Sequence, residues 1–380
     1  MKNMKKLIAM MLMMASVFFI ACEDDGESTL SPEQAKTELN NLETDMSGYL
    51  EEMVNSKGME AIEVLMAMPD PFAGAKANVK TSVIPNIHKF LLPVNPEKTK
   101  SVYEGVGFDF DTYKGYKYVY TTTPYEYFDP QPIDEDIIII EFPTEGSTTN
   151  DAALTIHNYE EEVINEVDEW GYQYSDYYPT AILADLYINE IKIVEIDLDA
   201  EWDTSGEPSS FDISVYLTPF TFSGSFDHTA TAASIDFDIK YNTEQIFAAG
   251  VNATFESSEL DEPLTVGGYV QLLNVKVEAT VDVQGIDAIF TALENQTSPY
   301  TTIDELAAAI NDEIDAVVLV DGVKAADIEI LYDETNAEEP VTIVFVFSDG
   351  TTEPALPYFE GFVTDIEDFF YFLDDVYGDW

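Results

Sequence analysis

Apolar and polar residues alternate with a period of two along most of the chain after residue 101. Successive side chains of a strand point to opposite faces, so this alternation predicts strands with one buried face. The run Ile137–Ile140 is instead continuously β-branched, which favours a strand buried on both faces. Turn signals such as Asn189-Glu190 separate the alternating segments, so we expect an antiparallel meander. Its strands are expected at 116–120, 181–203, 211–217, 220–226, 234–241, 245–255, 268–283, 317–320, 328–332 and 341–347.

Apolar spacings of three or four residues predict helices at both ends of the chain and late in its middle. Ser31-Pro32-Glu33-Gln34 has the form of a capping box, and a second box at Thr302–Glu305 begins a late helix. Further helices are expected at 59–68 and 286–295. The apolar face of the first helix holds Leu39, Leu42, Met46, Leu50 and Met53, and that of a C-terminal helix holds Phe362, Ile366, Phe369, Phe370, Leu373 and Val376.

These elements predict an α+β, β-rich fold, in which N-terminal, late and C-terminal helices pack on a large antiparallel meander sheet. A curved half-barrel of the lipoprotein-carrier type is one way to close such a sheet, by analogy of pattern alone. The organisation we expect is a signal peptide at 1–21, an acidic tether at 22–30, a helical N-terminal segment at 31–100, and a β-rich body at 101–380 with helices near 286–312 and 362–377.

The first 21 residues have the composition of an export signal. Lys2, Lys5 and Lys6 precede an uncharged stretch of 14 residues, 7–20, which is shorter than the roughly 20 residues that a spanning helix needs. The stretch ends in Phe19-Ile20-Ala21-Cys22, and Cys22 is the one cysteine of the chain.

Phe19-Ile20-Ala21-Cys22 resembles the lipobox of bacterial lipoproteins, although Phe19 stands where Leu is usual. The following Cys22-Glu23-Asp24-Asp25 resembles the acidic export signal of Bacteroidota surface lipoproteins. The resemblance implies that the chain is cleaved before Cys22, that Cys22 carries the lipid, and that the protein is anchored in the outer membrane and exposed at the cell surface. It covers residues 1–25 only and implies a location in the cell, not an activity.

The charge of the chain excludes several classes of partner. Lysine accounts for all 16 basic residues, against 74 acidic ones, for a formal charge of −58. Removing residues 1–21 takes away three lysines and no acids and leaves 13 − 74 = −61, of which 4 − 57 = −53 lies in residues 118–380. Nucleic acids and anionic membrane surfaces are bound through clustered basic residues, so neither is an expected partner. The membrane contact we expect is through the N-terminal lipid.

One strand carries the sharpest pattern of acidic residues. Glu195, Asp197, Asp199, Glu201 and Asp203 alternate with Ile196, Leu198, Ala200 and Trp202, which places the carboxylates on one face. Four of them, Asp197, Asp199, Glu201 and Asp203, are candidate Ca²⁺ ligands, because Ca²⁺ takes six to eight oxygens. A solvated outer sheet face is the interpretation we favour, and no other cofactor is expected.

An aromatic stretch supplies the candidate ligand-binding residues Trp170, Tyr172, Tyr174, Tyr177 and Tyr178. Flat rings stack on the C–H faces of sugars while nearby carboxylates and amides bind the hydroxyls. The mixed composition of residues 169–179 argues against one regular element there. The alternative is a wall of tyrosines that covers the edge of the sheet, with hydroxyl groups toward water.

Catalytic motifs are not apparent. His88, His157 and His228 are isolated in the sequence, and no Gly-x-Ser-x-Gly elbow occurs. We therefore expect a non-enzymatic, lipid-anchored envelope protein that binds a glycan or another small ligand. A structural or adhesive envelope protein with a cation-bridged acidic surface is the alternative. A carboxylate-based extracellular hydrolase and a carrier of hydrophobic molecules follow.

The charge also predicts how salt affects stability. Like charges on the folded chain repel, and the Debye length falls from about 10 Å at 0.1 M salt to about 3 Å at 1 M. We expect the melting temperature of the mature chain, residues 22–380, to rise between these two concentrations of NaCl. A melting temperature that stays flat, measured by circular dichroism, would contradict this expectation.

Overall fold

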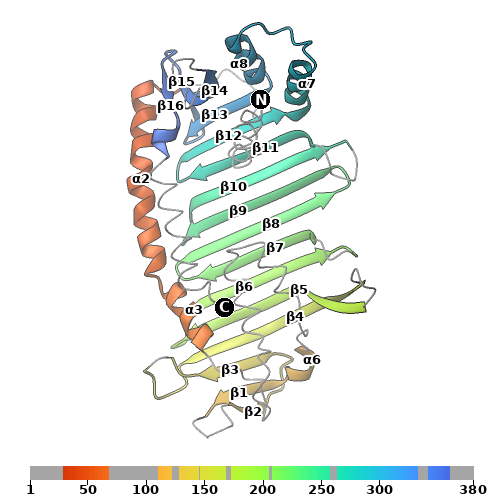
Figure 1. Cartoon of the computed structure of the whole chain (residues 1–380). Helices are drawn as coiled ribbons and strands as arrows, with labels where there is room; N and C mark the ends of the chain where they lie inside the picture. The colour runs from red at the N-terminus through yellow and green to blue at the C-terminus, as the bar shows by residue number, and fades with distance from the viewer. Residues whose placement is uncertain are drawn as a thin grey trace. The chain divides into compact units, whose positions relative to one another are not determined.

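The computed structural model describes residues 29–67, 110–121, 128–144, 146–167, 173–204, 208–256, 263–332 and 341–359. Within them, 16 strands form a single mixed sheet that is not closed, so the expected β-rich α+β class is confirmed (Figure 1). Strands pair in chain order from β16 back to β3, and β1 and β2 complete the sheet in the order β3-β1-β2. The predicted meander therefore accounts for nearly all of the pairing.

Each predicted strand within these residues is found, and most extend beyond the predicted bounds. The strands are β1 Tyr116–Tyr120, β2 Phe128–Pro132, β3 Ile138–Phe142, β4 Ala152–Val167, β5 Gln173–Ile188, β6 Ile191–Trp202, β7 Pro208–Leu217, β8 Phe220–Thr229, β9 Ala232–Tyr241, β10 Glu244–Phe255, β11 Pro263–Leu272, β12 Val275–Asp282, β13 Ile314–Val320, β14 Val323–Tyr332, β15 Val341–Phe347 and β16 Thr352–Pro354. The helical elements are α2 Pro32–Val54, α3 Lys57–Ala67, α6 Phe110–Tyr113, α7 Val283–Glu294, α8 Ile303–Asn311 and the 3₁₀ turn η2 Leu356–Tyr358.

Two-residue turns join several of the long strands. The predicted turn at Asn189-Glu190 connects β5 to β6, and both residues have positive φ, 51° and 65°. Positive φ at both central positions gives the turn a twist that matches the twist of antiparallel strands. Asn242 and Leu273 take the same left-handed conformation in the turns before β10 and β12.

β2, β4 and β16 are not among the expected strands, and two details of pairing and burial also differ from the expectation. β1 pairs with β3 in parallel, with Tyr116 opposite Ile138, because the β2 hairpin takes the other edge of β1. The isoleucine run is not buried on both faces either. Ile138 and Ile140 are fully buried, whereas Ile139 is only half-buried on the opposite face, where Lys117 binds Glu141 at 3.1 Å.

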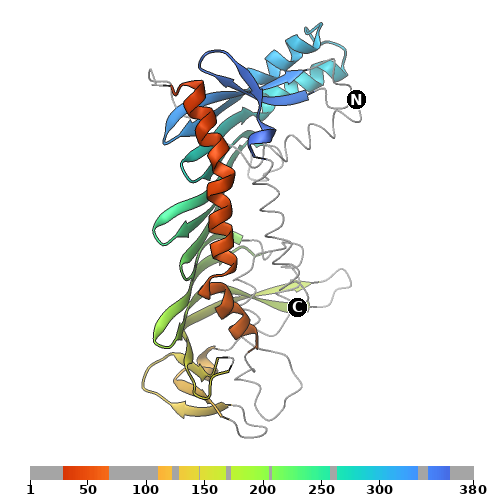
Figure 2. The same cartoon turned by 90° about the vertical axis from the view of Figure 1, so that its left-hand side faces the viewer.

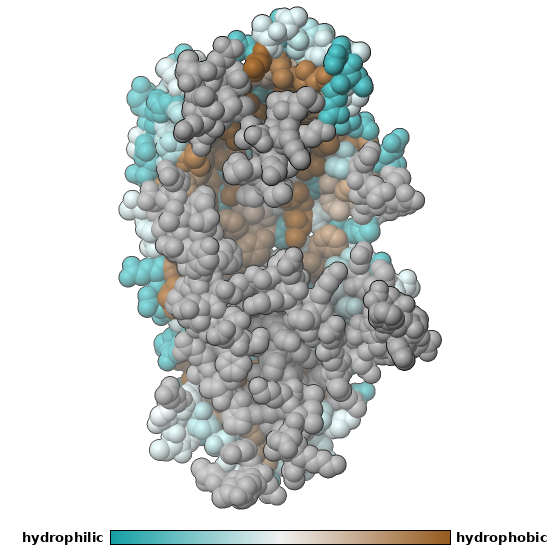
Figure 3. Space-filling model, in the orientation of Figure 1, coloured by the Kyte–Doolittle hydropathy of each residue, from teal (hydrophilic) through white to brown (hydrophobic). Residues whose placement is uncertain are grey.

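The structure divides into two compact units. The first comprises residues 1–50, 226–239 and 244–372, and the second comprises residues 51–225, 240–243 and 373–380. In each unit a helix packs on some of the strands: α2 on β11 to β15 in the first, and α3 on β6 and β7 in the second. Figure 3 shows hydrophobic side chains gathered over the strands on the side toward the viewer, with hydrophilic side chains at the margins.

The core of the first unit forms where α2 lies on the apolar face of β11 to β15. Ala35, Leu39, Leu42 and Met46 project from α2 at the predicted spacings of three and four residues and are at most 3% exposed. Figure 2 shows the first turns of this helix beside β14 to β16. The strands contribute Val270, Leu272, Val275, Val277, Val318, Val320, Ala326, Phe345 and Phe347 to the same cluster.

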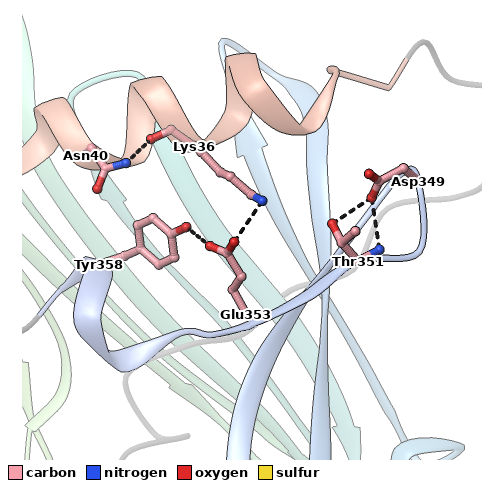
Figure 4. A network of polar contacts seen from close by, with 6 residues as sticks. All are labelled: Lys36, Asn40, Asp349, Thr351, Glu353 and Tyr358. Carbon is pink, nitrogen blue, oxygen red and sulfur yellow. Dashed lines mark hydrogen bonds and ion pairs between the residues drawn. The ribbon is translucent and has the colours of Figure 1, made fainter.

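Polar contacts fix the beginning of α2 to the sheet edge (Figure 4). Lys36 Nζ lies 2.8 Å from Glu353 Oε1 and 4.6 Å from the centre of the Phe347 ring. The Tyr358 hydroxyl donates to the second oxygen of Glu353. Hydrogen bonds from Lys36 and then from Tyr358 lower the pKa of Glu353, so this carboxylate keeps its charge and its partners.

Capping boxes stabilise both helices for which they are predicted. Ser31 Oγ accepts from the Gln34 N–H at 3.4 Å, and Gln34 Oε1 accepts from the Ser31 N–H at 3.3 Å. At α8 the Thr302 hydroxyl accepts from the Glu305 N–H at 3.2 Å, while Glu305 accepts in return from the backbone of Thr302. Each box satisfies backbone donors that a helix start leaves without partners.

In the second unit, α3 packs closely on the end of β7. The Gly58 N–H donates to the Thr218 carbonyl at 3.1 Å. A Cβ atom at Gly58 would lie 2.5 Å from the Leu217 carbonyl carbon and 2.6 Å from Leu217 Cβ. Glycine therefore sets how closely this helix approaches the sheet, and Met59, Ile62 and Leu65 of α3 are buried beside it.

The two edge strands of the open sheet are poor templates for further pairing. β2 has the sequence Phe-Asp-Pro-Gln-Pro, and Pro130 and Pro132 lack the N–H that a new neighbour would need. β16 at the other edge is three residues long. Proline and shortness are devices that protect exposed sheet edges from pairing with a second chain.

Several predicted segments fall outside the described residues: the signal segment 1–21 with Cys22, most of the tether, residues 68–100 of the N-terminal segment, and the C-terminal helix at 362–377. Within the part of the chain that is described, the helices are too short or too polar to cross a membrane.

Two helical glycines give a matched test of the packing. Gly58→Ala should destabilise the mature chain by about 1–3 kcal/mol, because the new methyl group overlaps Leu217. Gly48→Ala in α2 should stabilise it by about 0.5–1 kcal/mol, because alanine restricts the unfolded chain. Nothing lies within 4 Å of the added methyl group at Gly48. Urea denaturation followed by circular dichroism measures both changes, and effects of the same sign would contradict the assigned packing.

Candidate binding face on strands β4 to β7

The acidic pattern of residues 195–203 separates onto two faces of β6 as predicted. Ile196, Leu198 and Ala200 are 2%, 5% and 4% exposed, whereas Asp197, Asp199 and Glu201 are exposed. The apolar side belongs to the core of the second unit. The carboxylates face solvent.

The candidate Ca²⁺ ligands run in a row along the strand. Asp197 lies opposite Ser214, and Asp199 lies opposite Asp212 on β7, while Asp203 follows the end of β6. Among the residues that the structure describes, no group of three or more Asp, Glu, His or Cys side chains is arranged to hold a metal ion. The facing pair Asp199 and Asp212 is a like-charge contact, which destabilises a sheet.

The aromatic stretch is placed only in part. Trp170 and Tyr172 lie outside the described residues, and the side chains of Tyr174 and Tyr177 on β5 are not among those described. β5 begins at Gln173, so the expectation that residues 169–179 avoid one regular element is wrong from that point on.

Tyr178 belongs to the core and not to an exposed platform. It is 8% exposed, and its ring centre lies 4.9 Å from that of Trp202. The Trp202 indole N–H donates to the Pro179 carbonyl at 2.9 Å. Tyr178 therefore has little exposed surface, and a register shift on β5 separates it from the buried Ile182. Ligand binding by this residue stays a prediction.

A cluster of charged side chains that the sequence did not single out lies on the outward face of β4 to β6. His157 Nε2 on β4 lies 2.6 Å from Asp185 Oδ2 on β5, and their side chains are 38% and 16% exposed. Lys192 on β6 donates to Glu195 on the same strand. The register places Asp185 directly opposite Glu195, so the two ion pairs are neighbours.

Electrostatic coupling supports this proximity. The hydrogen bond to Glu195 is the largest contribution that raises the pKa of Lys192, and Tyr187 and Asp185 add to it. The ammonium group therefore lies within the field of groups from β5 as well as β6. It stays charged throughout the physiological pH range.

Exposed rings and apolar side chains surround these charges. Tyr187, opposite Lys192 in the register, is 37% exposed, and Leu183 is 39% exposed. Tyr216 on β7 lies opposite Glu195, and its hydroxyl donates to Thr218 Oγ1 at 2.8 Å. We call this set the outer polar face; it comprises His157, Leu183, Asp185, Tyr187, Lys192, Glu195 and Tyr216.

The first unit has a polar cluster of a different kind, which is closed on itself. Tyr269 donates to Asp236 at 3.2 Å, and Lys276 lies 4.8 Å from the centre of the Tyr269 ring. Lys276 also pairs at 2.5 Å with Glu278, whose side chain is 6% exposed. Burial and then the Asp236 carboxylate raise the pKa of Tyr269 to about 12.

Gly250 makes this cluster sterically feasible. A Cβ atom there would lie 2.3 Å from Asp236 Oδ1 and 2.6 Å from Tyr269 Cε1. The Tyr269–Asp236 contact thus crosses over β10 and ties β9 to β11. Because its groups bind one another, we interpret the cluster as a structural contact between strands.

Comparisons with known proteins do not assign a family. No protein-family model matches the sequence, and no curated protein matches it. Among solved structures, the chain is similar to a porin-like protein from Bacteroides vulgatus, at 13% identity and a TM-score of 0.19, over 52% of this chain and 93% of that one. At this TM-score the likeness carries no argument about fold or function.

The facing carboxylates Asp199 and Asp212 give a testable electrostatic effect. Asp212→Lys should stabilise the mature chain by about 0.2–1 kcal/mol at low salt, because it replaces a repulsive cross-strand pair with an attractive one. Asp227→Lys on β8 changes the net charge equally and serves as the control. The difference between the two variants should shrink in 1 M NaCl, and urea denaturation at both salt concentrations measures it. Equal effects of the two variants would contradict the local pairing.

Proposed function

We propose that this chain is a lipid-anchored, non-enzymatic protein of the bacterial cell envelope, exposed at the surface of the outer membrane, that binds a glycan on the outer polar face. The lipobox-like Phe19–Cys22 and the acidic residues after it support the location. Two or more acyl chains on Cys22 would hold a soluble body on the bilayer, since each buried methylene contributes about 0.8 kcal/mol.

The observation that carries the proposed ligand is an exposed ring beside paired charges on one strand face. Tyr187 offers a flat apolar surface of the kind on which the C–H face of a sugar stacks. Asp185 and Glu195 can accept hydrogen bonds from sugar hydroxyls, and Lys192 can donate to them. Because the charged groups hold one another in place, a sugar would meet donors and acceptors that are already oriented.

The same geometry supports binding rather than catalysis. His157 and Lys192 are each engaged with a carboxylate. They stand on an outward strand face, where water is present and screens their fields. Catalytic groups work best in sites that exclude water, where fixed charges act at full strength. A glycan held here would be recognised and released unchanged.

Glycan-array binding by the mature chain tests this function. Tyr187→Ala should weaken the binding of the best glycan about fivefold, which corresponds to about 1 kcal/mol for one aromatic contact. Tyr116→Ala is the matched control, since Tyr116 is an exposed strand tyrosine, 40% exposed, outside the outer polar face. Lys192→Met should also weaken binding, through the loss of a donor.

Three outcomes decide the matter. An array without binding overturns the glycan as ligand. Binding that Tyr187→Ala leaves unchanged overturns the outer polar face as the site. Binding that falls with Trp170→Ala but not with Tyr187→Ala would move the site to the aromatic stretch at 170–178.

A further inference from the structure

The last residues of the expected tether are fixed to one margin of the first unit. The Leu30 N–H donates to the Lys324 carbonyl at 2.9 Å, at the start of β14. The Leu30 carbonyl accepts from Ser348 Oγ at 3.0 Å, directly after β15. The chain is therefore attached to two strands before α2 begins.

The first turns of α2 are held to the same margin. Lys36 pairs with Glu353 of β16, and Tyr358 of η2 donates to that carboxylate (Figure 4). Apolar contacts of Ala35 and Leu39 with the core lie beneath these polar ones. Moving the start of α2 away from β14 to β16 would expose this core, so the exit point of the tether is fixed.

The tether is short. Leu30 is the eighth residue after Cys22, and eight steps of a fully extended chain span at most about 26–29 Å. A lipid on Cys22 therefore keeps this margin close to the bilayer, whatever path the intervening residues take.

We propose that the margin formed by Leu30, Ser348, β16 and η2, the anchor margin, rests against the bilayer surface, with Leu356 in contact with the lipid. The inference rests on the lipid anchor of the proposed function and adds the orientation of the first unit.

Surface chemistry supports this contact. Leu356 is 64% exposed, and the exposed Pro357 follows it. Two ion pairs lie nearby: Lys36 pairs with Glu353 at 2.8 Å, and Lys324 pairs with Asp327 at 2.7 Å. Asp349 adds one further carboxylate, which accepts hydrogen bonds from Thr351. A margin with two of its carboxylates paired approaches a zwitterionic bilayer with less electrostatic cost than the carboxylate-lined strand faces, and an exposed leucine gains free energy on leaving water.

Site-specific fluorescence on the lipidated full chain tests the orientation. Because Cys22 is the one native cysteine and its sulfur carries the lipid, an introduced cysteine can be labelled alone. Thr352→Cys places the probe on β16 in the anchor margin. Ser47→Cys places it on α2, about 24 Å further along the helix from Ser31 at 1.5 Å per residue. Both positions are exposed.

The labelled proteins are reconstituted in phosphatidylcholine vesicles that contain lipids with a nitroxide on the headgroup. We expect quenching at residue 352 to be at least about threefold stronger than at residue 47, given that quenching by a nitroxide falls steeply over a separation of this size. Adding Leu356→Asp to the Thr352→Cys protein should reduce the quenching, since it removes the apolar contact.

Flotation of the vesicles tests the lipid anchor separately from the orientation. A chain that fails to float, or that floats equally well as Cys22→Ala, overturns the lipid anchor and the orientation with it. A chain that floats through Cys22 but shows equal quenching at both positions, or stronger quenching at residue 47, overturns the orientation alone. Quenching at residue 352 that Leu356→Asp leaves unchanged removes Leu356 from the contact.

Discussion

Removing one apolar face of a long open sheet from water is the requirement on which this structure depends. A closed barrel would bury such a face in its interior, but among the described residues this sheet is open, with β2 and β16 as its edge strands, so its strands need other elements to cover them. In the first unit α2 supplies that cover, with Leu39, Leu42 and Met46 directed at the strands. Burying a leucine or methionine side chain contributes about 1.5–3 kcal/mol, so one face of a single helix accounts for a substantial part of the stability of this region. The ion pair between Lys36 and Glu353 then sets where along the strands the helix lies.

The pattern of residues predicts most of this architecture because the signals are local. Period two places Ile196 and Leu198 on the buried side of β6, and both capping boxes form as their residues predict. The features that the sequence does not predict depend on how the strands pair. The parallel register of β1 and β3 follows from which edge of β1 the β2 hairpin occupies, and Ile139 lies on the less buried face of β3, which it shares with the Lys117–Glu141 pair. Local composition contains neither fact.

In the candidate site, too, local signals are predictable and contacts that depend on strand pairing are not. The burial of Tyr178 could not be predicted from its spacing to the buried Ile182, because a register shift on β5 between Pro179 and Ala181 breaks the alternation. The His157–Asp185 pair was beyond prediction. Its partners are 28 residues apart, and a register shift in β4 between Ile156 and Asn158 decides what His157 faces. The seven residues of the outer polar face come from four strands, and only the meander brings them together.

The protected edges of the sheet also bear on how the protein behaves when it is crowded. A sheet with free edges offers its own copies a template, and close packing of many copies in two dimensions multiplies their encounters. Pro130 and Pro132 remove donors from one edge, and the other edge ends in three residues. A second copy that meets either of these edge strands therefore finds few backbone groups with which to extend the sheet.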